Sequence, residues 1–173
     1  MKLIQTTVMA IACFSSVAPA QKITSQYDRA TDFSRFKTYK WITIQGATPP
    51  NQITAQNIEN IVNTQLAQKR LALVGELNAD LLVGYQSSVK QQTQLNWFND
   101  GGPWMGGMGQ ATTSLIDVGT LVVDMYDASR KQLVWRGSAT KTLNPSGNPD
   151  KNYEHLQKAV EKLLKSFPPK EKY

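Results

Sequence analysis

Few side chains in this 173-residue sequence could carry out chemistry. His155 is the only histidine and Cys13 the only cysteine. A zinc-type site needs several imidazole or thiolate ligands, so the sequence predicts no metal site and no cofactor. A triad can be written from Ser138, His155 and Asp124, but no local motif presents the serine as a nucleophile. The sequence therefore predicts no catalytic residues, and we expect a protein that is not an enzyme.

Three carboxylates lie close together in the sequence, at Asp117, Asp124 and Asp127. Glycoside chemistry would need two carboxyl groups across a cleft, roughly 5–9 Å apart. A structural interpretation instead places Asp127 in a turn and pairs Asp124 with Arg136 on an adjacent strand. The sequence favours this structural ion pair over an acid–base pair.

The most unusual stretch runs from 96 to 109 and mixes large apolar side chains with five glycines and a proline. This composition disfavours regular structure, so we expect a long loop over 91–115. Such a loop either packs on its own domain or waits for a partner. The partner interpretation predicts contact with an envelope protein or with a membrane or glycan surface. The contact residues would be Trp97, Phe98, Trp104, Met105 and Met108.

The two methionines also permit a third interpretation of this stretch. Met105 and Met108 have Met-x-x-Met spacing, and thioethers are soft ligands that suit Cu(I). Two thioethers without a nearby histidine make a weak site, so copper stays the minor alternative.

Two helices would position these residues. Apolar residues recur at helical spacing within 51–70, and we expect this stripe to face the core. A second helix begins at Asn148, an N-cap, with Pro149 at its first position. Its apolar residues repeat as far as Phe167, and Pro168 stops it. The first stripe comprises Ile58, Ile61, Val62 and Leu66; the second comprises Leu156, Ala159, Val160, Leu163, Leu164 and Phe167.

Strands are predicted over 37–43, 80–90, 119–127 and 132–143, with a short one at 71–74. The last two long strands form a hairpin across Asp127 to Lys131, in which Leu133 and Trp135 would join one apolar layer. The fold class is therefore α+β: two layers, with an antiparallel or mixed sheet and both helices packed on one face.

The N-terminal residues 1–20 are typical of a signal peptide. Lys2 is followed by an apolar stretch too short to span a bilayer, and Ala18 and Ala20 suit a signal-peptidase site. Cleavage after Ala20 leaves a single domain over 21–168 with a charged tail at 169–173. A competing interpretation makes Cys13 a lipidation site, although Ala10 stands where a lipobox usually has leucine. We expect a periplasmic or outer-membrane-associated protein, and soluble export is favoured over the lipid anchor.

The net charge of +6 is concentrated in the last quarter of the chain. Residues 129–173 hold ten Lys or Arg against four Asp or Glu. A solvated helix face with a charged tail explains this excess, with an anionic membrane surface as the alternative. No recognised nucleic-acid-binding motif is present, and no transmembrane segment is predicted.

Several segments together resemble the DUF4136 family of bacterial envelope proteins, many of which are described as lipoproteins. The resemblance implies an exported α+β domain of unknown function and supplies no catalytic residues. Two functions from different classes fit. One is a non-catalytic binding or structural module, and the other is a small-ligand carrier or an enzyme with a pocket between sheet and helices. The matching segments are 27–28, 32–33, 36–41, 79–83, 119–124, 127–128, 133–137, 159–160 and 167–168.

Overall fold

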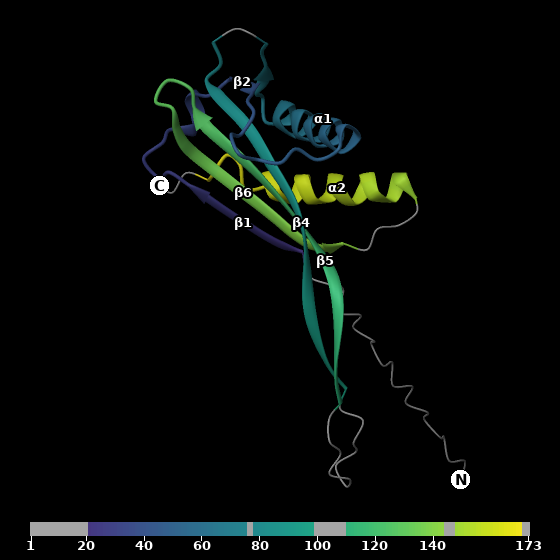
Figure 1. Ribbon diagram of the computed structural model, residues 1–173. Coiled ribbons are helices and arrows are strands. Elements are labelled where there is room, and N and C mark those ends of the chain that lie inside the picture. Colours follow the sequence, from purple (N-terminus) through teal and green to yellow (C-terminus); the bar gives the residue numbers. More distant parts are fainter. Residues whose placement is uncertain (1–20, 76–77, 99–109, 144–147, 171–173) are drawn as a thin grey trace, which may run out of the picture.

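The computed structural model describes residues 21–75, 78–98, 110–143 and 148–170 (Figure 1). Their strands form a six-stranded mixed sheet in the order β1-β6-β5-β4-β2-β3. β2 runs parallel to β3 and β4, and the other neighbours are antiparallel. The elements are β1 (Lys22–Tyr27), the 3-10 helix η1 (Phe33–Arg35), β2 (Thr38–Trp41), α1 (Gln52–Gln68), β3 (Ala72–Leu73), β4 (Leu81–Phe98), β5 (Gln110–Asp127), β6 (Gln132–Leu143) and α2 (Pro149–Leu164).

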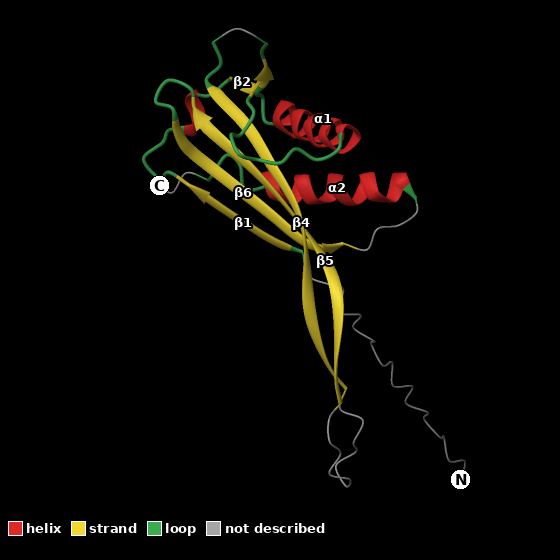
Figure 2. Cartoon of the chain, in the orientation of Figure 1, coloured by secondary structure: helices red, strands yellow, loops and turns green. Residues whose placement is uncertain are grey.

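Both helices lie over the same face of the sheet, so the predicted two-layer α+β fold is confirmed (Figure 2). The core fills the space between these layers. From α1 it takes the predicted stripe Ile58, Ile61, Val62 and Leu66, and from α2 it takes Val160, Leu163 and Leu164. The sheet contributes Leu81, Val83, Val123, Met125 and Trp135, each at most 1% exposed.

Polar caps fix where the helices begin. The side-chain oxygen of Asn51 accepts a hydrogen bond from the backbone N–H of Thr54, at 2.9 Å. Asn148 accepts in the same way from Asp150 and Lys151, with Pro149 at the first position as predicted. These bonds satisfy backbone donors that have no partner inside the helix.

α2 ends earlier than its apolar pattern predicts. Its last helical residue is Leu164, and Phe167 lies in the turn that follows. The Phe167 ring is 2% exposed and meets the Trp135 ring edge to face, with 5.4 Å between centroids. Phe167 therefore joins the core from outside the helix.

Leu133 does not join the apolar layer, contrary to the sequence prediction, and is 40% exposed. The cause is a register shift between β5 and β6 at Met125/Tyr126. Because side chains alternate across a strand, one extra residue turns those beyond it to the other face. Trp135 pairs with Met125 inside the core, whereas Leu133 pairs with Tyr126.

The prediction of a loop over 91–115 is wrong at both ends, where the structure has strands. β4 continues to Phe98 and β5 begins at Gln110, and their pairing is unbroken from Leu81↔Asp127 to Phe98↔Gln110. β6 stops pairing with β5 at Asp117, so residues 92–98 and 110–116 form a two-stranded arm that leaves the sheet (Figure 1). Residues 99–109, with Trp104, Met105 and Met108, lie outside the described residues.

Candidate functional site

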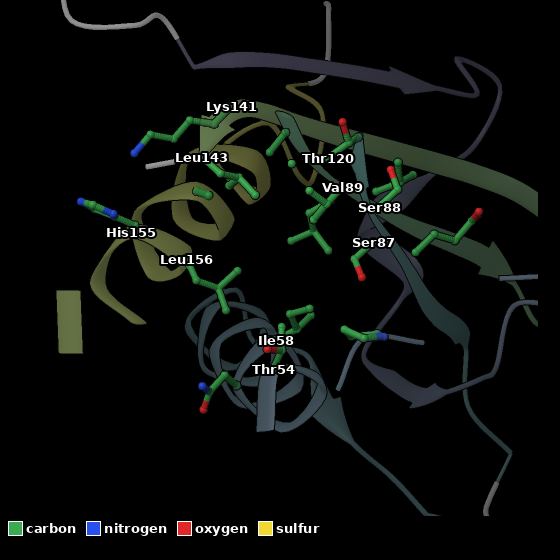
Figure 3. Close-up of a pocket in the computed structure, with 18 of the residues that line it drawn as sticks. Thr54, Ile58, Ser87, Ser88, Val89, Thr120, Lys141, Leu143, His155 and Leu156 are labelled. Atoms are coloured by element: carbon green, nitrogen blue, oxygen red, sulfur yellow. The ribbon is translucent and has the colours of Figure 1, made fainter. Parts of the chain in front are cut away.

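A groove opens where the first turns of both helices stand over the sheet (Figure 3). Its volume is about 1120 Å³. Small-molecule sites in proteins usually measure roughly 300–1,000 Å³. The groove is therefore large enough for a ligand of considerable size.

Its floor is made by neighbouring rows of side chains on β4, β5 and β6. One row is Ser87, Leu121 and Ala139, which pair across the three strands. The next row outward is Val89, Gly119 and Lys141. The small side chains at Ser87, Gly119 and Ala139 leave space between the sheet and the helices that larger side chains would fill.

The walls come from the two helices and from the segment before α1. α1 contributes Thr54 and Ile58, α2 contributes Leu156 and Ala159, and residues 46–50 close one side. In Figure 3 the side chains of Ile58, Leu156, Val89 and Leu143 surround an open space. Lys141 and His155 extend outward on the same side of the opening.

Exposed apolar side chains gather at this groove. In the described part of the chain, eight large apolar side chains are exposed, and four of them line it: Ile53, Val89, Leu143 and Tyr153. Val89 is 64% exposed even though it lies on the sheet face that the helices cover elsewhere. A set of solvent-exposed apolar side chains around a concavity marks a site of interaction.

The polar side chains of the groove are mainly hydroxyls and amides. Among the described residues that line it, only Lys141 and His155 can carry positive charge, and none is an aspartate or glutamate. Across the described residues, no group of three or more His, Cys, Asp or Glu could hold a metal ion. The described lining residues therefore offer apolar contacts and hydrogen-bonding groups.

None of the three aspartates singled out by the sequence lines the groove, and two of them, Asp124 and Asp127, are buried in ion pairs. Asp124 is fully buried and binds Arg136 through two contacts, Nε to Oδ1 at 2.5 Å and a terminal nitrogen to Oδ2 at 2.8 Å. Gln86 donates to the same carboxylate at 3.3 Å. The bond to Asp124 raises the pKa of Arg136. The structure thus brings together the two residues that the sequence pairs.

Replacing Asp124 with asparagine is expected to lower the free energy of unfolding by about 2 kcal/mol, because a buried charge-assisted pair loses its charge. Urea unfolding of D124N measures this. The matched control is D117N, since Asp117 is exposed on the same strand. Equal midpoints for D124N and the unmodified protein would show that the pair contributes nothing to stability.

Asp80 fastens β2 to β4. Its carboxylate accepts from the backbone N–H groups of Lys37 and Thr38, at 2.8 and 2.9 Å, and from the Thr38 hydroxyl. The Lys37 N–H is the main cause of the lowered pKa of Asp80. Asp80 therefore supports the sheet beneath α1 and takes no part in the groove.

Of the predicted partner residues, the structure describes only the backbones of Trp97 and Phe98. Trp97 and Phe98 belong to β4 in the arm, where their backbones pair with Ala111 and Gln110. Trp104, Met105, Met108 and the lipidation candidate Cys13 lie outside the described residues. Their roles stay predictions.

The sequence allowed a pocket between sheet and helices as an alternative but did not identify the residues that line this groove. Its signal was faint: Ser87, Gly119 and Ala139 are small residues on otherwise apolar strand faces. In the ranges that the structure describes, no helix is both long and apolar enough to cross a membrane.

The sheet order, with two helices over one face and a groove between the layers, defines a two-layer α+β domain. Residues 23–169 match DUF4136, a domain of unknown function, and the chain belongs to this family. The resemblance noted in the sequence is thereby confirmed. No curated protein sequence matches the chain.

Several solved structures share the fold. A PDZ domain protein from Parabacteroides distasonis aligns with a TM-score of 0.57 and 15% identity, over 89% of this chain and 36% of that one. This chain therefore spans little more than a third of that protein. A PelC dodecamer from Paraburkholderia phytofirmans aligns with a TM-score of 0.54 and 12% identity, over 88% of this chain and 100% of that one. At these identities the likeness shows the fold alone.

Proposed function

We propose that this protein is an exported, non-catalytic binding module of the cell envelope that holds a small apolar ligand in the groove. The observation that carries the proposal is the groove of about 1120 Å³, which four exposed apolar side chains line together with hydroxyl and amide groups. Such a mixture binds and orients a ligand. Export is supported by residues 1–20, which have the order of charged, apolar and small residues of a signal peptide.

Carriage is favoured over catalysis because the groove lacks reactive pairs. His155, the only imidazole of the chain, extends outward in Figure 3, and none of the described lining residues carries a carboxylate that could serve as its partner. General acid–base chemistry needs such groups within hydrogen-bond reach of the reacting atoms. The hydroxyls of Ser87 and Thr54 can instead form hydrogen bonds with a polar end of the ligand.

The test is native mass spectrometry of the full chain, expressed in a bacterial host and recovered by osmotic shock. We expect a polypeptide that begins at Gln21, together with a bound small molecule that organic solvent releases. V89W should lose this molecule, because a larger side chain at a 64% exposed position fills the groove. L115W is the matched control, since Leu115 is 65% exposed and lies outside the groove.

Two results would contradict the proposal. Retention of the chain in the cytoplasm with residues 1–20 attached would contradict export. A protein without bound small molecules, for which V89W and L115W behave alike in every binding measurement, would contradict the ligand-binding role.

A further inference from the structure

We infer that the groove binds a single-chain anionic lipid, with its acyl chain against the apolar lining and its carboxylate at the rim beside Lys141. The inference rests on the proposed function and names the chemical class of its ligand. Three features of the described residues support it: the apolar lining, the charge of the rim and the orientation of the two helices.

The apolar lining suits an alkyl chain. Ile58, Leu121 and Ala139 lie at most 7% exposed at the base, and Val89 and Leu143 stand more exposed above them. An acyl chain could therefore contact apolar side chains along its length, from the base of the groove to its rim. Burying such a chain is favourable in proportion to the apolar area removed from water.

The side-chain charge of the rim favours an anion. Lys141 lies in the outer floor row, and its side chain extends outward on the same side as His155 (Figure 3). Three carboxylates lie near this rim without lining the groove. Glu154 on α2 is engaged by Lys158 at 2.5 Å, Asp150 lies in the first turn of α2, and Asp117 pairs with Leu143, one row beyond Lys141. A carboxylate head bound beside Lys141 would meet this cation directly, and none of the described aspartates and glutamates is among the lining residues.

The helices add to this positive potential. Asn51 and Pro149, at the starts of α1 and α2, both line the groove. The N-terminal end of a helix carries a partial positive charge that stabilises nearby anions. The first turn of α1 holds no acidic residue, whereas that of α2 holds Asp150. The start of α1 and Lys141 therefore favour a negatively charged head group.

The experiment is calorimetric titration of the exported protein with monomeric amphiphiles below their micelle concentrations. The probes are decanoate, laurate and myristate, with dodecyl maltoside and dodecyltrimethylammonium as neutral and cationic partners of laurate. We expect affinity to rise roughly tenfold for every two added methylenes. Laurate should bind about fivefold more tightly than the maltoside, and the cation most weakly.

Protein variants distinguish the contribution of the ligand's head group from that of its acyl chain. K141Q should lower the affinity for laurate about fivefold and leave the affinity for the maltoside unchanged. K22Q is the matched control, because Lys22 pairs with Thr140, next to Lys141 but on the opposite face of the sheet. V89W should weaken every probe, and L115W none.

The outcomes distinguish this inference from the proposed function. Equal binding of all three head groups, unaffected by K141Q, would overturn the anionic ligand and leave the apolar groove in place. No binding of any amphiphile would overturn both. Binding to anionic vesicles that V89W leaves unchanged, in place of monomer binding, would make a membrane surface the partner and overturn the inference.

Two other occupants would also overturn it. If the chain from Gln21 binds laurate and the uncleaved chain does not, the segment 1–20 occupies the groove. If the protein sediments as a dimer that V89W dissociates, the occupant is a second copy.

Discussion

Replacing Asp127 with alanine is expected to lower the free energy of unfolding by about 3 kcal/mol. Asp127 is 1% exposed and ends β5 at the hairpin turn. Its carboxylate accepts from the backbone N–H and the hydroxyl of Ser129, at 2.9 and 2.7 Å, and from the backbone N–H of Arg130. Alanine would leave these turn donors without their acceptor.

The same carboxylate joins distant parts of the chain. Arg130 binds it through Nε at 2.8 Å, and Arg35, in η1, binds it as well. Arg130 also donates to the hydroxyl of Thr31, which donates to Asp28. Asp127 therefore ties the β5–β6 turn to the segment between β1 and β2.

Urea unfolding of D127A gives the measurement, and R35Q is its matched control. The Arg35 side chain is 45% exposed, so R35Q should cost only about 1 kcal/mol. If D127A loses no more free energy of unfolding than R35Q, the N–H and hydroxyl donors of the turn bind water instead. The buried carboxylate would then not be what stabilises this turn.

Residues that mark the family resemblance have structural tasks in this fold. Asp28 accepts from Thr31, Asp32 caps η1 and Asp80 holds β2 to β4. None of the three lines the groove. Other family-marking residues do line it, namely Gly119 and Leu121 on β5 and Ala159 on α2. The segments that carry the resemblance therefore contribute both to the scaffold and to the floor and wall of the groove.

Local patterns identified the parts of the fold that bury one regular face. The stripe of α1 and the N-cap of α2 are local signals, and both agree with the structure. β1 was missed because, in Lys22–Tyr27, only Ile23 is even partly buried. An edge strand gains its stability from pairing with β6, which the residues of β1 alone do not reveal.

The arm was missed for a related reason. Residues 91–94 of β4 read Gln-Gln-Thr-Gln, without alternating apolar residues. Their strand conformation comes from the register with β5 set by the buried pairs near Val83 and Met125. The groove depends on three strands and two helices together, so no single segment of the sequence displays it.

Replacing Gly137 with alanine is expected to cost about 3 kcal/mol and to lower the melting temperature by roughly 6–10 °C. A β-carbon at Gly137 would lie 2.3 Å from Cη2 of Trp135 and 2.7 Å from Cδ1 of Leu163. Both neighbours are fully buried, and Trp135 is held by the Phe167 ring. The added methyl group therefore forces the sheet and α2 apart.

Gly75 provides the matched control. A β-carbon there meets nothing within 4 Å, so G75A should change the melting temperature by less than about 2 °C. G137A should lower the melting temperature less in an L163A background than in the unmodified protein, because L163A removes one of the two clashes. Equal stability of G137A and G75A would mean that the Trp135 ring can move, contrary to its packing.

G137A also tests how the scaffold shapes the groove. Gly137 does not line the groove, but Leu163 belongs to α2, whose first turns form one of its walls. A displaced α2 would move Leu156 and Ala159 away from the floor residue Leu121. Amphiphile binding should then weaken at temperatures where G137A is still folded, whereas G75A should bind as the unmodified protein does. Unchanged affinity in a folded G137A would show that the clash is absorbed within the core.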